Sequence, residues 1–144
     1  EAKIEQSVYF FKHPNMKKEL GIANSMFFAT RYDYLRIAKS ILDDWQNDTC
    51  MGKYLKTIYE NRIPKGNFDQ SFGLSNTFSG TKAYAGFFHT DYIGLKKRSI
   101  MGMNGYGDQE IIIDFDRSRI LVIHSMHGNY NWKKIAYSVI KKGN

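Results

Sequence analysis

The sequence is poor in cysteine and proline, and it contains no long hydrophobic run. Its single cysteine, Cys50, excludes an internal disulfide, and its two prolines leave no proline-rich linker between domains. No apolar stretch reaches the roughly 18 residues that a membrane-spanning helix requires. The first residues also lack the basic and then apolar pattern of a signal peptide. We therefore expect no membrane span, and a start at Glu1 that either follows a removed leader or lies within a longer protein.

The sequence does contain enough apolar residues for a folded core. In a chain of 144 residues, 42% are hydrophobic and 15% aromatic, which excludes a disordered protein and indicates one domain, or a fragment of one, over residues 1–144. The net charge of +7 is of the kind found in nucleic-acid-binding proteins. The lysines and arginines are scattered, however, in short clusters at 16–18, 96–98, 133–134 and 141–142. We interpret them mainly as a solvated surface.

Three segments have the apolar spacing of amphipathic helices. The clearest is 29–45, in which apolar residues recur on one helical face. Thr30 stands at its start with Asp33 three residues later, a pattern that resembles a capping box. Residues 50–62 predict a shorter second helix, and residues 131–142 predict a last helix that packs one apolar face on the rest of the domain.

Strands are predicted between the second helix and the last one. Residues 82–94 read as one strand, and 95–103 as a turn into the next. Residues 109–115 and 119–125 are two apolar strands of a hairpin, whereas 67–79 has the composition of a loop. Consecutive strands with short turns favour an antiparallel sheet. We therefore predict an α+β fold, with an antiparallel sheet of three to four strands and helices packed on it.

Two patterns could indicate a metal or nucleotide site, and we interpret both as structural. His124 and His127 are three residues apart and His89 lies in another predicted strand, but no cysteine or acidic residue has a zinc-like spacing to them. The glycines of 102–107 do not form a dinucleotide fingerprint, and they lead into a strand rather than a helix. They are better explained as glycines that let a strand bend or approach a neighbour.

Three short matches to catalytic motifs are interpreted as chance. Ser79–Lys82 and Ser138–Lys141 match Ser-x-x-Lys, which functions only with the serine at a buried helix N-terminus. Ser79 instead begins a predicted strand, and Ser138 lies within the last predicted helix. Tyr59–Asn61 matches Tyr-x-Asn but falls on the amphipathic second helix.

Three segments taken together resemble a known superfamily. They are 22–45, with its "ATRYDYLRIAKSIL" core, 82–88 "KAYAGFF", and 105–114 "GYGDQEIIID". In order and spacing they resemble the serine β-lactamases, D-alanyl-D-alanine carboxypeptidases and esterases, nearest to class C β-lactamase-like proteins and 6-aminohexanoate-dimer hydrolases. The resemblance covers about residues 20–142, including the closing helix.

The resemblance implies a part of an active site rather than a whole one. In that family the Ser-x-x-Lys and Tyr-x-Asn motifs precede the helix at 29–45, so the resemblance identifies this chain as the C-terminal part of a serine hydrolase. Only the family's third motif, a Lys or His followed by x-Gly on the strand beside the cleft, falls within the chain. Its positions correspond to Met103, Asn104 and Gly105, and Tyr106 and Gly107 would follow beside the cleft.

Further expectations follow from the same resemblance. Met103 stands where a charged side chain would bind a substrate carboxylate, so an ester or amide substrate is favoured over a β-lactam or peptidoglycan. A backbone N–H of this strand would supply one oxyanion-hole donor. We expect no cofactor and no metal, no activity of the chain alone, self-association through an exposed sheet edge, and a periplasmic or cell-envelope location for the parent protein.

Two alternatives remain open at this stage. One is a complete small basic domain that binds nucleic acid or a protein partner through its surplus of positive charge. The other is a structural module whose open sheet edge pairs with another chain.

Overall fold

The structure, a computed structural model, describes residues 3, 9–12, 25–65, 81–95, 97–105, 109–125 and 131–141. It contains three helices, α1 (Arg31–Gln46), α2 (Cys50–Glu60) and α3 (Trp132–Ile140). A small antiparallel sheet pairs β1 (Tyr9–Lys12) with β2 (Ser25–Phe28). The main sheet has six antiparallel strands in chain order: β3 (Ile63–Pro64), β4 (Thr81–Ala85), β5 (Phe88–Tyr92), β6 (Ile100–Gly105), β7 (Gln109–Asp114) and β8 (Arg119–Ile123).

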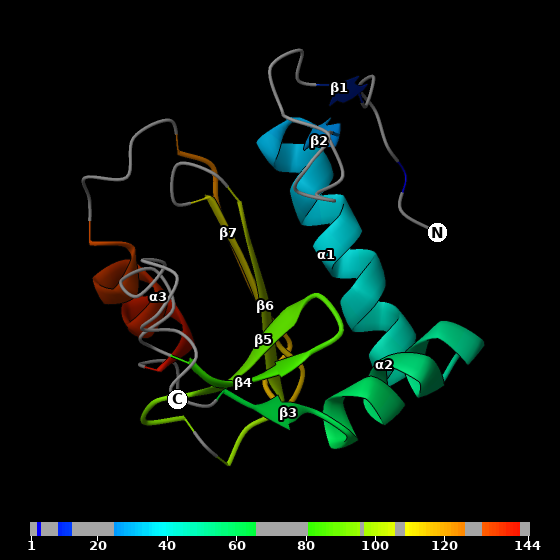
Figure 1. The fold of residues 1–144 in the computed structure, drawn as a ribbon, viewed down its shortest axis with the longest axis vertical. Coiled ribbons are helices and arrows are strands. Elements are labelled where there is room, and N and C mark those ends of the chain that lie inside the picture. The colour runs from blue at the N-terminus through cyan, green and yellow to red at the C-terminus, as the bar shows by residue number, and fades with distance from the viewer. Residues whose placement is uncertain are drawn as a thin grey trace, which may run out of the picture.

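The main sheet lies between two helical layers, with α1 and α2 on one face and α3 on the other (Figure 1). Successive residues of the central strands therefore enter different cores. Ile112 joins the cluster that contains Ala136 of α3, whereas Ile113 joins the cluster that contains Leu42 of α1. This two-sided burial explains why 109–115 is apolar without alternation, since side chains on both faces of the strand are covered.

The helix starts follow from local side-chain chemistry. The Thr30 hydroxyl accepts a hydrogen bond from the Asp33 backbone N–H at 3.2 Å and donates to the Asp33 carboxylate at 2.8 Å. Thr49 caps α2 in the same way, accepting from the Gly52 backbone N–H at 3.1 Å. The helix start predicted at Thr30 is confirmed as an N-cap, because its hydroxyl satisfies a backbone donor that the first helical turn leaves open.

The α+β class is confirmed, but the predicted count of three to four strands is wrong. The segment 82–94 is two strands rather than one, because the chain reverses at Gly86, whose φ of 61° is readily adopted only by glycine. The edge strand β3 and the hairpin of β1 and β2 were not predicted. The loop predicted at 67–79 lies outside the described residues. In the described part of the chain, no helix is long and apolar enough to cross a membrane.

Candidate functional site

The three residues predicted for the cleft strand form the end of β6. Met103, Asn104 and Gly105 pair with Ile111, Glu110 and Gln109 of β7, respectively. Met103 is half-buried, whereas Asn104 and Gly105 are exposed. On the other side β6 pairs with β5 at Gly102, so the last three residues of β6 have no strand partner there among the described residues. Tyr106 and Gly107 lie outside the described residues.

The strand alternation places these side chains on different faces of the sheet. Asn104 is opposite Glu110, two residues from Ile112 in the α3-side core, and therefore faces α3. Met103 is opposite Ile111, which packs with the α1-side core, and therefore faces the other way. The feature that Met103, Asn104 and Gly105 share is therefore a backbone edge on the β5 side that no described strand pairs with.

A buried phenol–carboxyl pair lies behind this strand. Tyr92 of β5 places its hydroxyl against Gly102, where a Cβ atom would stand only 1.8 Å from the Tyr92 oxygen. Burial, followed by the charge of Glu110 and the proximity of Tyr137, raises the pKa of Tyr92 well above its ordinary value of 10.0. Tyr92 is therefore held as a neutral phenol against β6. An acidic residue inside the apolar run 109–115 was the sequence signal for this pair.

A second polar group lies on the strands beside β6. Lys65 donates to the Thr81 hydroxyl at 2.6 Å, and its Nζ lies 2.9 Å from Nδ1 of His89. Burial and the adjacent ammonium of Lys65 lower the pKa of His89 from 6.5 to about 4. His89 is consequently a neutral imidazole at pH 7, in register with Gly102. Sequence reasoning considered His89 only as a metal ligand and missed its pairing with Lys65.

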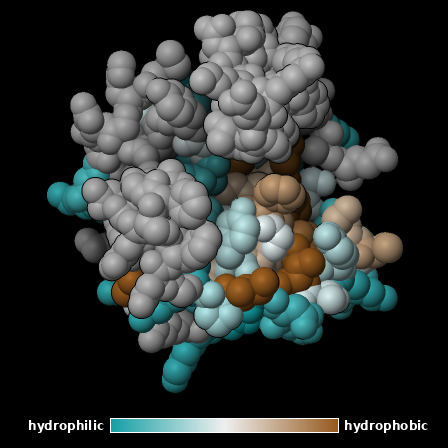
Figure 2. Space-filling model, viewed as in Figure 1, coloured by the Kyte–Doolittle hydropathy of each residue, from teal (hydrophilic) through white to brown (hydrophobic). Residues whose placement is uncertain are grey.

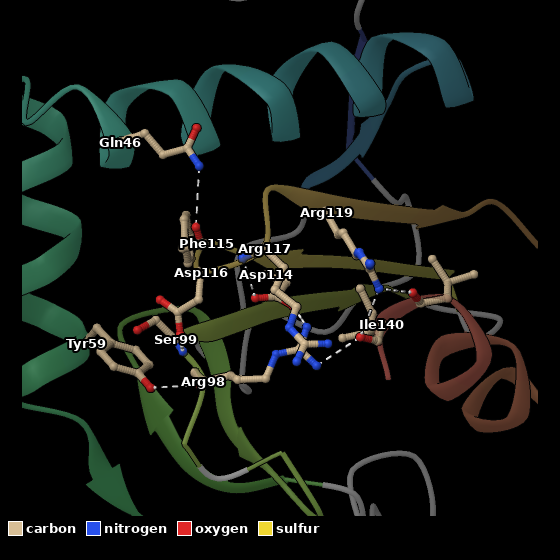
Figure 3. Close-up of polar contacts among 11 residues, drawn as sticks. Gln46, Tyr59, Arg98, Ser99, Asp114, Phe115, Asp116, Arg117, Arg119 and Ile140 are labelled. Carbon is tan, nitrogen blue, oxygen red and sulfur yellow. Dashed lines mark hydrogen bonds and ion pairs between the residues drawn. The ribbon is translucent and has the colours of Figure 1, made fainter. Parts of the chain in front are cut away.

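A third polar cluster occupies the opposite end of the sheet. Arg98, before β6, forms an ion pair with the fully buried carboxylate of Asp114 at the end of β7. Arg98 also donates to the Ile140 carbonyl at 2.9 Å, and Arg119 donates to the Val139 carbonyl at 3.1 Å, as Figure 3 shows for the labelled side chains. These arginines bind the C-terminal carbonyls of α3 and so fix that helix to the sheet.

The other catalytic look-alikes have structural roles where the structure describes them. Ser138 lies in α3, as predicted, and its hydroxyl donates to the Ile135 carbonyl at 2.7 Å. Tyr59 donates to the Arg98 carbonyl at 3.3 Å, and Asn61 ends α2 by donating to the Thr57 carbonyl at 2.8 Å. Ser79 lies outside the described residues.

The structure describes two of the three histidines that were considered as metal ligands. His89 contacts Lys65 and the Tyr84 ring, His124 is exposed, and His127 lies outside the described residues. Within the described ranges, no group of three or more potential ligands from His, Cys, Asp and Glu is close enough to hold a metal ion.

Comparisons with known proteins give no relative from which site residues could be transferred. No protein-family model, curated protein or solved structure matches this chain. The expectation for Met103, Asn104 and Gly105 therefore depends only on the residue pattern and on the geometry at the end of β6.

Proposed function

We propose that this chain forms the C-terminal part of a β-lactamase-like serine hydrolase and contributes one wall of its cleft. The observation that carries the proposal is the end of β6, where Asn104 and Gly105 are exposed and no described strand pairs with the β5 side, inside an antiparallel sheet covered by helices on both faces. The parent enzyme would form an acyl-enzyme on a serine upstream of this chain and release it by attack of water.

The strand would act through its backbone. A backbone N–H aimed at the developing oxyanion contributes roughly 10²–10³ in rate in enzymes of this kind. Gly105 leaves room for a substrate to approach the backbone, because it has no side chain. Met103 faces the α1 side and carries no charge, so the strand offers no cation for a substrate carboxylate. An ester or amide without that carboxylate is the substrate class that fits.

An exposed apolar surface supports the proposal that this chain is only part of a larger folded unit. Figure 2 shows apolar residues grouped in the middle of one face, with hydrophilic residues along its lower rim. Phe87, at the turn between β4 and β5, is 85% exposed, and Ile63 of β3 is 72% exposed. Large apolar side chains left this exposed are consistent with a surface that another element covers. The catalytic part of the parent enzyme is the covering element that the proposal implies.

The proposal is tested by the coding sequence upstream of Glu1 and by one reconstitution. We expect that sequence to encode a Ser-x-x-Lys and then a Tyr-x-Asn. Coexpression of that segment with this chain should hydrolyse p-nitrophenyl butyrate, and alanine at the motif serine should abolish the activity. This chain alone should hydrolyse neither the ester nor nitrocefin. Turnover by the chain alone, or an upstream stop codon, would refute the proposal.

A second candidate function is a small basic domain that binds nucleic acid or a protein partner. The observation that favours it is the gathering of cationic side chains at the end of the sheet opposite Gly105, where Lys97, Arg98, Arg117 and Lys141 line one hollow. Binding to DNA or RNA that weakens steeply with salt would support this function, because such binding releases condensed counterions.

A further inference from the structure

The strand β4 has one packed face and one open face. Ala83 and Ala85 are buried, whereas Lys82 and Tyr84, which alternate with them along the strand, are exposed. The packed face belongs to the side of α1 and α2, because Ala85 is opposite Phe88, which packs on the α1-side core. The open face is therefore on the α3 side of the sheet, and on it the Tyr84 side chain is 38% exposed.

Strand register independently places Tyr84 on the α3 side. Tyr84 is opposite His89, and His89 is opposite Gly102 of β6. Gly102 is in turn opposite Ile112, a member of the α3-side core. Residues directly opposite each other direct their side chains to the same face of a sheet. In the described part of the chain, however, no residue of β3 or β4 belongs to the α3-side core, so this core covers the inner strands and not β4.

The ring of Tyr84 is held in place by a chain of contacts. It packs against the His89 ring, with the ring centroids 4.9 Å apart and the ring planes at 63°. Nδ1 of His89 lies 2.9 Å from Nζ of Lys65, which also donates to the Thr81 hydroxyl at 2.6 Å. The His89 imidazole stays neutral at pH 7, because burial and Lys65 lower its pKa to about 4. A side chain that is already oriented loses less entropy when a ligand packs on it.

The charges around Tyr84 are predominantly positive. Lys82 is exposed two residues from Tyr84 on the same strand, and Lys65 contacts the histidine on which Tyr84 packs. Asp91 is the one acidic residue among those of β3, β4 and β5, and Arg62 binds its carboxylate at 2.9 Å. The whole chain has a net charge of +7. This open face therefore combines an oriented aromatic ring with a positive potential.

We propose that the open face of β4 around Tyr84 binds single-stranded nucleic acid by base stacking. An exposed aromatic ring offers a stacking surface to any base, and neighbouring lysines neutralise the phosphates that flank the stacked base. A duplex fits this face less well, because its bases already stack on one another and only its backbone and groove edges would reach Tyr84. The proposal rests on the second candidate function and places it here rather than at the hollow. A nucleic acid on this face would take the place of the covering element that the hydrolase proposal implies.

The test is fluorescence anisotropy with a labelled oligouridylate 12-mer at low salt. We expect saturable binding, and Tyr84→Ala should weaken it about tenfold because a stacked base loses its partner. Tyr84→Phe keeps the ring and should bind within about twofold of the wild-type chain. The matched control is Tyr54→Ala, which removes a 60% exposed tyrosine from α2 and should also stay within about twofold.

The salt dependence gives a second measurement. Lys82→Gln should reduce the slope of log affinity against log salt by about 0.7, the change expected for one phosphate contact on a single strand. The variant Lys97→Gln/Lys141→Gln removes exposed cations at the hollow and should leave this slope unchanged. Circular dichroism should show that every variant is folded.

The remaining outcomes separate this proposal from the function on which it rests. No saturable binding of the 12-mer would overturn both, and loss of self-association in Tyr84→Ala would then assign the face to a second copy of the chain. Binding that weakens in Lys97→Gln/Lys141→Gln but not in Tyr84→Ala would overturn this proposal alone and would place the nucleic acid at the hollow. Equal weakening by Tyr84→Ala and Tyr54→Ala, or a duplex 12-mer bound as tightly as the single strand, would also overturn stacking on Tyr84.

Discussion

The contact between Gly102 and Tyr92 predicts a marked loss of stability in the variant Gly102→Ala. The new Cβ atom would lie 1.8 Å from the Tyr92 hydroxyl oxygen and 3.1 Å from Cζ of the same ring. Tyr92 is only 4% exposed and belongs to the α3-side core, so its ring has no free space to enter. The hydroxyl must move by about 1 Å or more, or β6 must separate from β5.

The magnitude follows from the cost of overpacking a core. Adding a methyl group to a closely packed site costs about 1–3 kcal/mol, and the upper half of that range applies here because the contact is far inside van der Waals distance. The matched control is Gly105→Ala on the same strand, where the new Cβ would meet the Gln109 Cβ at an ordinary 3.6 Å. Gly105→Ala should change the free energy of unfolding by no more than about 0.5 kcal/mol.

The assay is equilibrium unfolding in urea, arranged as a double-mutant cycle with Tyr92→Phe. Removing the hydroxyl costs about 1 kcal/mol by itself, but it also removes the atom that clashes most with the added methyl group, so the double variant should recover about 1–2 kcal/mol relative to additivity. Additive effects, or equal stability of Gly102→Ala and Gly105→Ala, would refute the packing of Tyr92 over Gly102.

Three further predictions concern the helices and His89. Gly52→Ala should destabilise the fold by about 2–3 kcal/mol, because the added Cβ would lie 1.8 Å from the Asp44 backbone oxygen. Lys53→Ala, the control in the same helix, should change the stability by no more than about 0.5 kcal/mol, and chemical denaturation compares the two variants. Thr30→Ala should cost about 1 kcal/mol in the same assay through loss of the α1 cap, and Thr30→Ser should restore most of it. Folding lowers the pKa of His89 from 6.5 to about 4, so between these pH values the unfolded chain binds a proton that the folded chain does not. The free energy of unfolding should therefore fall as pH drops from about 6.5 to 4. After allowance for solvent screening at this half-buried site, the loss should be about 1–2 kcal/mol, and His89→Gln should flatten that part of the profile; an unchanged profile would contradict the assignment.

The sequence predicted the helices well because their signals are local. Thr30 and Asp33 contact each other directly, and an amphipathic face shows its spacing within one segment. The division of 82–94 into β4 and β5 was missed because apolar residues continue through Gly86, and only its positive φ reveals the reversal. The site was harder to predict, since Lys65 and His89 are 24 positions apart and meet only through strand register. The same holds for the hollow, whose cations come from separate clusters in the sequence.

The two outer strands of the main sheet, β3 and β8, differ in length and composition. This difference indicates which edge of the sheet we expect to pair with a second copy of the chain. The outer strand β3 is two residues long and contains Pro64, which cannot donate a backbone hydrogen bond, so this edge resists pairing. The opposite strand, β8, is five residues long and mostly apolar, and α1 and α3 both contact it, so an added strand would also lie between helices.

All five β8 side chains are only half-buried, whereas Ile112 and Ile113 of β7 are fully buried. We therefore expect the chain alone to self-associate through β8. Analytical ultracentrifugation should show dimers whose dissociation constant rises at least tenfold in Val122→Lys, because a charge on an edge strand opposes pairing. Lys82→Glu on β4 serves as the control and should leave the dissociation constant of the dimer unchanged. A strictly monomeric wild-type chain at millimolar concentration would show that the β8 edge is already covered within the chain itself.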